Sequence, residues 1–270
     1  MKKKAMAAVS AAVCVSMLLS ACGSSASTST TAAPAETTAA EAKAEDTTAA
    51  AEPAASGDVV TINIGFENTT EEPIGQAVEK WAELLKEESN GTMELKVFAN
   101  SALGNKSKLI DQMVMGENVI TIADGAYYAD YGVPDLGILY GPFFFDDWDE
   151  VWKLIDSDWY KEQCGKLANK GLTVLGSNWV YGERELMTKD KVVVPADIKG
   201  KKIRLANSQI YVEGFNALGA TAVPMALGDV YTSLQNGTLD GVENPLSTLY
   251  GQSFQEVTKN ILMTGHILNF

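Results

Sequence analysis

The feature that most constrains the fold is an alternation of strand-like and helix-like segments along the first part of the apolar chain. The strand-like segments are short and rich in β-branched residues, and the helix-like segments repeat apolar side chains at helical spacing. In chain order they occupy residues 59–66, 70–90, 93–98, 106–115 and 119–123. Strand, helix, strand, helix, strand predicts a parallel sheet joined by right-handed crossovers.

Two short helices within residues 146–159 and a strand at residues 172–179 follow in the same lobe. A second set then predicts another lobe, with strands expected at residues 185–188, 202–205, 221–223 and 239–242 and helices at 209–218 and 229–236. We therefore predict an α/β protein with lobe 1 at residues 58–180 and lobe 2 at residues 181–266. Residues 267–270 have the pattern of a strand that starts a return into lobe 1, so we expect the sequence to be truncated at its C-terminal end.

The first 22 residues have the features of an export signal. A cationic start, residues 2–4, precedes a mostly apolar run, residues 5–19, which is shorter than the roughly 20 residues of a membrane-spanning helix. The sequence LSAC at residues 19–22 resembles a bacterial lipobox. This resemblance implies removal of residues 1–21 and lipidation of Cys22, and an ordinary signal peptide with a coincidental cysteine is the alternative.

Residues 22–57 consist almost entirely of Ala, Ser, Thr, Glu and Pro. Such a segment cannot bury enough apolar area to offset its ordering entropy, so we predict a disordered linker between the lipid anchor and the folded part. Cys14 would leave with the signal and Cys22 would carry the lipid. The remaining cysteine, Cys164, has no partner for an internal disulfide, and we interpret it as a core residue.

The composition and motifs disfavour several classes of function. The formal net charge of −14 argues against nucleic acid as a partner. His266 is the sole histidine, and HExxH, paired-cysteine and Walker-type motifs are absent, so enzyme signatures are weak. The acidic run at residues 146–150 lacks the spacing of a calcium loop, and we interpret it as a solvated helix start. We expect no catalytic residue, metal site or cofactor.

The arginines are the most distinctive charged residues. Arg184 and Arg204 are the only two in the sequence, and Arg204 is the only cation between Ile203 and Pro245. Arginine recognises carboxylates through two parallel hydrogen bonds, for which lysine is no equivalent. A lone arginine among apolar strands and small-residue turns is a candidate anchor for an anionic ligand, although a surface ion pair is the commoner role.

An ordered set of short motifs carries a family resemblance. It comprises YGERELMT (181–188), PADIKGKKIR (195–204), LGA (218–220), PM (224–225), DVY (229–231), LQNG (234–237) and DGVENP (240–245). In this order the motifs resemble the DctP-type substrate-binding protein of tripartite ATP-independent periplasmic (TRAP) transporters. The resemblance covers residues 58–270 and is densest over 181–266.

This resemblance implies a ligand site in lobe 2. Arg204 occupies the position of a strand arginine that forms a bidentate bridge to the ligand carboxylate. Arg184 matches a second arginine that faces the cleft. Asn244, in the ENP segment, matches a residue that lines the site, and Asn207 stands where the family often places a polar contact.

The match in lobe 1 is poorer. Glu67 and Asp124 follow predicted strands and are candidate acceptors for ligand hydroxyl groups, and helix-start or loop acids are the alternative, because a carboxylate near a bound carboxylate is unfavourable. Leu227 stands where some relatives use an aromatic residue, and His266 is a candidate for a water-mediated contact. Candidates for either the pocket wall or the core are Tyr127, Tyr128, Trp179 and Tyr211.

The resemblance also implies a function. It describes a periplasmic-binding-protein-like fold whose two lobes close on a ligand by hinge motion. The protein would be an extracytoplasmic lipoprotein, anchored to the cell membrane at Cys22, that captures a dicarboxylate, sugar acid or keto acid for TRAP permease subunits. The alternatives are the solute-binding protein of an ATP-driven importer and a surface lipoprotein with an enzymatic or structural role.

Overall fold

The computed structural model describes residues 58–270, so the predicted signal peptide (1–21), Cys22 and the predicted linker (22–57) lie outside the described residues. The described part contains two sheets. The smaller sheet has the order β2-β1-β3, with all strands parallel, which confirms the parallel sheet predicted from the alternating pattern. Its strands and crossover helices are β1 (Val60–Gly65), α1 (Pro73–Glu88), β2 (Met93–Phe98), α2 (Lys106–Val114) and β3 (Val119–Thr121).

Local chemistry explains where these helices begin and which face they bury. Pro73 occupies the first turn of α1, where its missing N–H costs no hydrogen bond. Val78 of α1 then packs with Ile64, Phe66 and Leu95 in a small core against the sheet. The side chain of Asn105 caps α2 by accepting a hydrogen bond from the backbone N–H of Lys108.

The larger sheet is mixed. Its path is β6-β5-β7-β4-β8, and β9 pairs with the start of β4 beyond that path. Strand β5 runs parallel to β6 and β7, whereas β4 runs antiparallel to β7, β8 and β9. The strands are β4 (Gly182–Thr188), β5 (Lys202–Leu205), β6 (Thr221–Pro224), β7 (Gly241–Pro245), β8 (Asn260–Leu262) and β9 (Leu268–Asn269).

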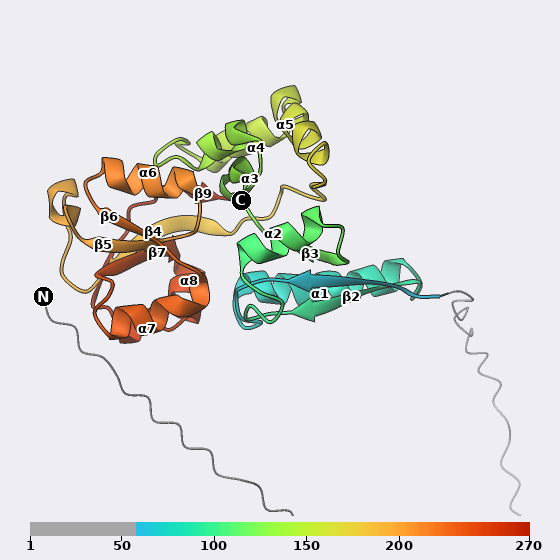
Figure 1. Ribbon diagram of the computed structural model, residues 1–270, viewed down its shortest axis with the longest axis horizontal. Helices are drawn as coiled ribbons and strands as arrows, with labels where there is room; N and C mark the ends of the chain where they lie inside the picture. The colour runs from blue at the N-terminus through green and yellow to red at the C-terminus, as the bar shows by residue number, and fades with distance from the viewer. Residues whose placement is uncertain (1–57) are drawn as a thin grey trace, which may run out of the picture. The chain divides into compact units, whose positions relative to one another are not determined.

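Helices cover both faces of this larger sheet. Figure 1 shows α6 on one side of it and α7 and α8 on the other. The α6 side holds the largest core, in which Ile203 and Leu205 of β5 pack with Tyr211 and Phe215. The other side holds a separate core around α7. The helices are α3 (Gly125–Asp130), α4 (Trp148–Ile155), α5 (Asp158–Ala168), α6 (Gln209–Ala217), α7 (Val230–Gln235) and α8 (Leu246–Gly251).

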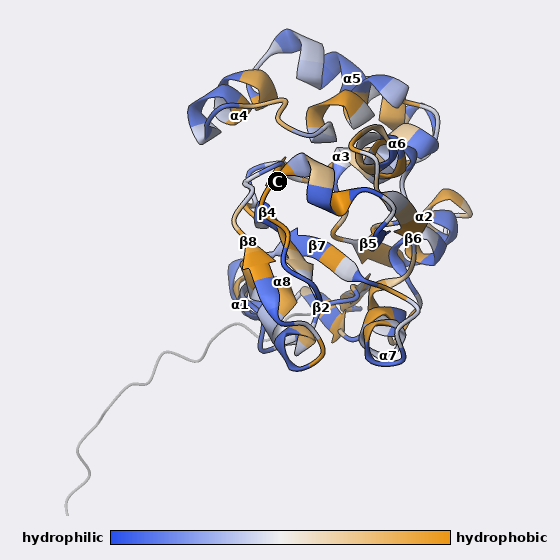
Figure 2. Ribbon diagram, turned by 90° about the vertical axis from the view of Figure 1, so that its left-hand side faces the viewer, coloured by the Kyte–Doolittle hydropathy of each residue, from blue (hydrophilic) through white to orange (hydrophobic). Residues whose placement is uncertain are grey.

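Short 3-10 helices and two amphipathic helices complete the described part. Figure 2 shows polar and apolar residues side by side along α4 and α5, as expected for helices with one buried face. The Asp147 carboxylate caps α4 by accepting from the N–H of Glu150, which confirms the interpretation of the acidic run as a helix start. The 3-10 helices are η1 (Pro134–Tyr140), η2 (Pro195–Ile198), η3 (Leu227–Asp229) and η4 (Phe254–Glu256).

Most predicted elements are present, but one strand prediction is wrong. Residues 172–179 form no strand, because their backbone groups find no partner strand among the described residues, and apolar alternation alone does not supply one. Among the α-helices and strands of residues 58–270, α3, α8 and β8 were not predicted. No helix within residues 58–270 is both long enough and apolar enough to cross a membrane.

Candidate functional site

Arg204, at the end of β5, is a buried guanidinium that forms no ion pair with any side chain of residues 58–270. It is 2% exposed. Its Nε and Nη2 donate to the carbonyl oxygen of Met225 at 2.9 and 2.7 Å. That bond fixes the plane of the guanidinium but leaves its charge unmatched. Burying an unpaired charge is costly, so this arrangement favours an anionic ligand at Arg204.

Arg184, at the start of β4, has a carboxylate partner. Its Nε and Nη2 donate to the two carboxylate oxygens of Glu243 at 2.5 and 2.7 Å. The His266 ring lies 3.2 Å from the same carboxylate and 2.7 Å from the Thr264 hydroxyl. Burial alone would raise the pKa of Glu243, but the charge of Arg184 and the hydrogen bonds from Arg184 and His266 lower it to about 2. The Arg184–Glu243 pair is therefore neutral as a whole.

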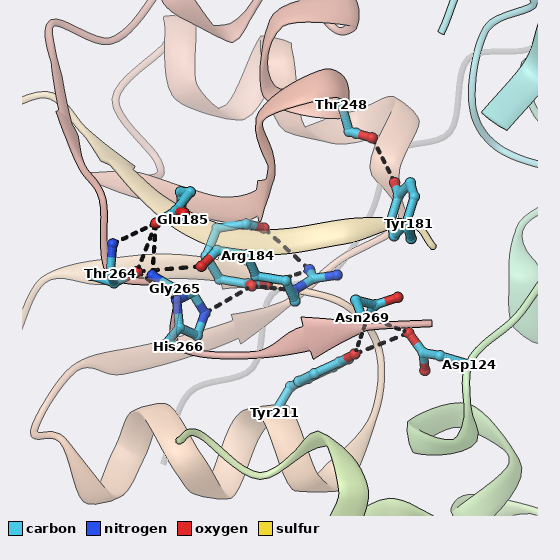
Figure 3. Close-up of polar contacts among 11 residues, drawn as sticks. Asp124, Tyr181, Arg184, Glu185, Tyr211, Thr248, Thr264, Gly265, His266 and Asn269 are labelled. Atoms are coloured by element: carbon cyan, nitrogen blue, oxygen red, sulfur yellow. Dashed lines mark hydrogen bonds and ion pairs between the residues drawn. The ribbon is translucent and has the colours of Figure 1, made fainter. Parts of the chain in front are cut away.

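A second group of polar contacts continues this network, as Figure 3 shows. The guanidinium carbon of Arg184 lies 5.0 Å from the centre of the Tyr211 ring. The Tyr211 hydroxyl donates to the Asp124 carboxylate at 2.9 Å, and the side-chain amide of Asn269 donates to both at 2.9 and 3.0 Å. Asp124 also caps α3 by accepting from the N–H of Ala126. Its oxygens are thus occupied by protein donors.

The side chains of the two arginines project from opposite faces of the larger sheet. Side chains alternate along a strand, and Leu205 packs with Tyr211 of α6, so its neighbour Arg204 points to the other face. There the strand partner of Arg204, Val242, packs in the α7 core. Arg184 lies over Tyr211 on the α6 face. Arg184 stands near the start of β4 and Arg204 near the end of β5.

Tyr127 of α3 marks the place where the charged groups converge. Burial raises the pKa of its hydroxyl well above the ordinary value. The negative charges of Glu67 and Asp124 raise this pKa further, whereas the positive charges of Arg204 and Arg184 lower it, so all four lie within electrostatic reach of the hydroxyl. The Tyr127 hydroxyl consequently stays neutral and can donate a hydrogen bond.

Glu67 and Asn244 each present an oxygen that no described group satisfies. Glu67 is 7% exposed, and its Oε1 accepts from the N–H of Leu227 at 3.3 Å, whereas its Oε2 accepts from no protein group of residues 58–270. Asn244 is 4% exposed, and its Oδ1 is buried without a hydrogen-bond partner. A fully buried acceptor without a partner, such as Asn244 Oδ1, is rare in folded proteins. Asn244 Oδ1 therefore needs a donor from a ligand, and Glu67 Oε2 is open to accept another.

Asn207 differs from the other predicted residues because it is exposed. Its side-chain amide donates to the Ser107 hydroxyl at 3.4 Å, a contact between the loop after β5 and the start of α2. The adjacent residue, Ser208, is buried and donates to the carbonyl oxygen of Ala126 at 2.7 Å. Sequence reasoning did not single out Ser208.

The pocket-wall candidates separate into two groups. Tyr127 and Tyr211 contact the site, as described above. Leu227 packs in the α7 core, so no aromatic ring stands at its position. Trp179 stacks edge-on against Trp81 of α1, with ring centres 5.8 Å apart, and belongs to the small core near the first sheet.

A buried polar contact that the sequence reasoning missed joins the two sheets. The carboxylate of Glu72, 2% exposed, accepts from the Thr248 hydroxyl and the Gln252 amide of the α8 region, both at 2.8 Å. It also accepts from Asn68 at 2.7 Å. The hydroxyl of Tyr181 closes the group, 2.6 Å from that of Thr248. Sequence spacing offered no signal, because Glu72 lies 176 positions from Thr248 and 180 from Gln252.

A cavity of about 820 Å³ lies next to this group and not at the arginines. Its wall is mainly apolar and includes β3 and the extended residues 171–179. Asp124 lines it, but neither arginine does. We assign the candidate site to the convergent charges at Tyr127, because a large apolar space explains neither the buried guanidinium nor the unsatisfied oxygens.

The chain is similar to known proteins in both sequence and fold. The family model described as "Bacterial extracellular solute-binding protein, family 7" (DctP) matches residues 64–269. The 2,3-diketo-L-gulonate-binding periplasmic protein YiaO of Escherichia coli is 31% identical over 207 residues, which are 76% of this chain and 62% of that protein. The chain thus spans less than two thirds of the length of this curated relative.

Solved structures show the same fold. A TRAP periplasmic solute-binding protein from Ochrobacterium anthropi with bound L-fuconate is 41% identical, with a TM-score of 0.76 over 78% of this chain and 70% of that one. Another from Actinobacillus succinogenes, with bound L-galactonate, is 37% identical, with a TM-score of 0.75 over the same shares. The predicted α/β fold with two lobes is therefore confirmed, whereas the boundary between the lobes near residue 180 stays a prediction.

Proposed function

Since the chain belongs to the bacterial extracellular solute-binding protein family 7, we propose that it captures a small organic carboxylate outside the cytoplasm and delivers it to TRAP permease subunits. The relatives named above are described with 2,3-diketo-L-gulonate, L-fuconate and L-galactonate, each of which carries a carboxylate. The chain acts as a binding protein and not as an enzyme. A lipid on Cys22, after removal of residues 1–21, tethers it to the membrane through the linker at residues 22–57.

The single observation that carries the proposal is the unpaired, buried guanidinium of Arg204. Its orientation is fixed by the Met225 carbonyl before a ligand arrives, so little ordering is needed on binding. A ligand carboxylate there gains a charge-assisted hydrogen bond in a site from which water is largely excluded. The same ligand removes the cost of leaving Arg204 buried without an anion.

The other candidate residues act around this contact. Arg184 donates to the ligand from the nitrogen that Glu243 leaves open, and Asn244 and Glu67 accept from polar groups of the ligand. Asn207 closes over the ligand from the loop after β5. Asp124 positions Tyr211, and through it the plane of Arg184. Two lobes that close by hinge motion bring these groups together.

A binding experiment with matched variants tests the proposal. Titration calorimetry and thermal shift with a panel of sugar acids, keto acids and dicarboxylates are carried out on the wild-type protein, Arg204→Ala and Lys202→Ala. Lys202 is exposed on the same strand, so its loss removes a cation without touching the site. A ligand at 100 times its dissociation constant stabilises the wild type by about 2.7 kcal/mol.

Arg204→Ala weakens binding by roughly 2–5 kcal/mol while the protein stays folded, and Lys202→Ala binds like the wild type. Near-wild-type affinity in Arg204→Ala would contradict the proposal that the ligand carboxylate binds at Arg204. A panel in which no organic acid shifts the melting temperature of the wild type rejects the function itself.

A further inference from the structure

The open hydrogen-bonding positions of the site distinguish between classes of carboxylate. Arg204 offers an unmatched positive charge, and the Tyr127 hydroxyl offers a neutral donor. The other two open positions, Glu67 Oε2 and Asn244 Oδ1, only accept. A ligand that satisfies all of them needs one anionic group and at least two donors. Hydroxyl groups supply donors, whereas an ionised carboxylate does not.

The charges around Tyr127 lead to the same conclusion. Arg184 is matched by Glu243, so the pair contributes no net charge. Lys106 adds a positive charge beside the Tyr127 ring, with its Nζ 5.1 Å from the ring centre. Arg204 is the buried guanidinium without a carboxylate partner within residues 58–270. Within residues 58–270 a second ligand carboxylate would find no second unpaired arginine, because Arg184 is paired with Glu243. It would also face Glu67 in a poorly hydrated place, where like charges repel strongly.

Asp124 and Glu67 are not equivalent in this respect. The oxygens of Asp124 accept hydrogen bonds from Tyr211, Asn269 and the N–H of Ala126, so three protein donors stabilise its negative charge. Glu67 accepts one backbone hydrogen bond of 3.3 Å and keeps the other oxygen open. Glu67 is thus the acid that a ligand meets.

Resting on the proposed function, we infer that the ligand is a hydroxylated acid with a single carboxylate, and that Glu67 is the residue that selects it. The ligand carboxylate binds at Arg204, and a ligand hydroxyl group donates to Glu67 Oε2. Another hydroxyl group donates to Asn244 Oδ1. Acids with a second carboxylate are rejected by Glu67, and acids without hydroxyl groups leave both acceptors unsatisfied.

Four kinds of acid separate these two effects in a calorimetric titration of the full-length protein. Galactonate and gluconate carry one carboxylate and several hydroxyl groups. Galactarate and glucarate keep the secondary hydroxyl groups of these acids and have a second carboxylate in place of the terminal CH2OH. Hexanoate has one carboxylate and succinate has two, both without hydroxyl groups. The best sugar acid with one carboxylate is expected to bind at least about tenfold tighter than its counterpart with two, and than hexanoate.

Glu67→Gln tests the selecting residue. The amide oxygen of glutamine still accepts from the N–H of Leu227, so the loop contact is retained while the charge is lost. The preference for one carboxylate over two is expected to fall by about tenfold or more. Glu79→Gln makes the same chemical change at an exposed position of α1 and leaves the preference unchanged. The melting temperature without ligand shows whether each variant folds.

The outcomes distinguish this inference from the function on which it rests. Equal or tighter wild-type binding of succinate, galactarate or glucarate overturns the single-carboxylate ligand and leaves the carboxylate-binding function standing. A folded Glu67→Gln variant with an unchanged preference overturns the role of Glu67. Absence of binding by every acid rejects the proposed function and this inference with it. The wild-type ratios decide the ligand class even where Glu67→Gln is unstable.

Discussion

The carboxylate of Glu243 holds the guanidinium of Arg184 at 2.5 and 2.7 Å, on the face of the sheet that Arg204 does not share. Both residues of this pair are almost completely buried. A buried ion pair contributes little net stability over an apolar pair, but removing one partner leaves an uncompensated charge. The pair therefore holds Arg184 in place, and the stability of the folded protein depends strongly on Glu243.

Glu243→Gln is expected to destabilise the protein by roughly 3 kcal/mol, because the buried guanidinium keeps one neutral acceptor in place of a carboxylate. This corresponds to a fall of about 6–12 °C in the melting temperature for a domain of this size. Glu213→Gln on α6, an exposed position, is the matched control and changes stability by less than about 0.5 kcal/mol. A melting temperature of Glu243→Gln equal to that of the control would contradict the role of the pair.

Acid is expected to weaken the fold through the same carboxylate. The pKa of Glu243 is about 2 in the folded protein against an ordinary value of 4.5, so its contribution is complete above about pH 4.5 and is lost as the pH falls toward 2. The difference amounts to roughly 3 kcal/mol. Urea denaturation of the wild type and of Glu243→Gln between pH 6 and 2 measures this contribution. The free energy of unfolding is expected to fall more steeply with decreasing pH in the wild type. Parallel curves for the two proteins would show that Glu243 titrates normally.

Gly251→Ala is expected to disturb the contact between the two sheets. A Cβ at Gly251 would overlap Cγ of Glu72 and lie 2.8 Å from its Cδ, so the carboxylate has to leave Thr248 and Gln252. Overpacking of this kind costs about 1–3 kcal/mol, which thermal denaturation detects. Gly165→Ala in α5 is the control, since nothing lies within 4 Å of its added Cβ and alanine favours a helix. Equal stability of the two variants would mean that Glu72 moves aside freely.

Tyr211→Phe isolates the hydroxyl that joins Asp124 and Asn269. The ring remains beneath Arg184, while one hydrogen bond to a buried carboxylate is lost. We expect a loss of about 1–2 kcal/mol in the free energy of unfolding. Tyr250→Phe, at a position that is 74% exposed, serves as the control with no change. A Tyr211→Phe variant as stable as this control would show that the hydroxyl is not needed to hold Asp124.

The sequence predicted what depends on local pattern. The parallel sheet, the two crossover helices and the strand of Arg204 follow from apolar periodicity, and the prominence of Arg184 and Arg204 follows from their rarity. What it did not predict depends on partners far away along the chain. Residues 172–179 have strand-like composition but no strand beside them, and α8 is placed by Glu72 and the sheet. The neutralisation of Arg184 by Glu243 required the register of β4 against β7.

The side chains of the two arginines project from opposite faces of one sheet. The site is therefore sensitive to any insertion or deletion of a single residue in its strands, which reverses the face to which each side chain points. Neighbouring side chains on β4 point in opposite directions, so a deletion of one residue before Arg184 would move Glu185 into the place of Arg184. A cation beside the ligand would then become an anion. Changes of two residues preserve the facing of every side chain. Length variation among proteins that share this site is therefore expected in the loops or in steps of two along β4.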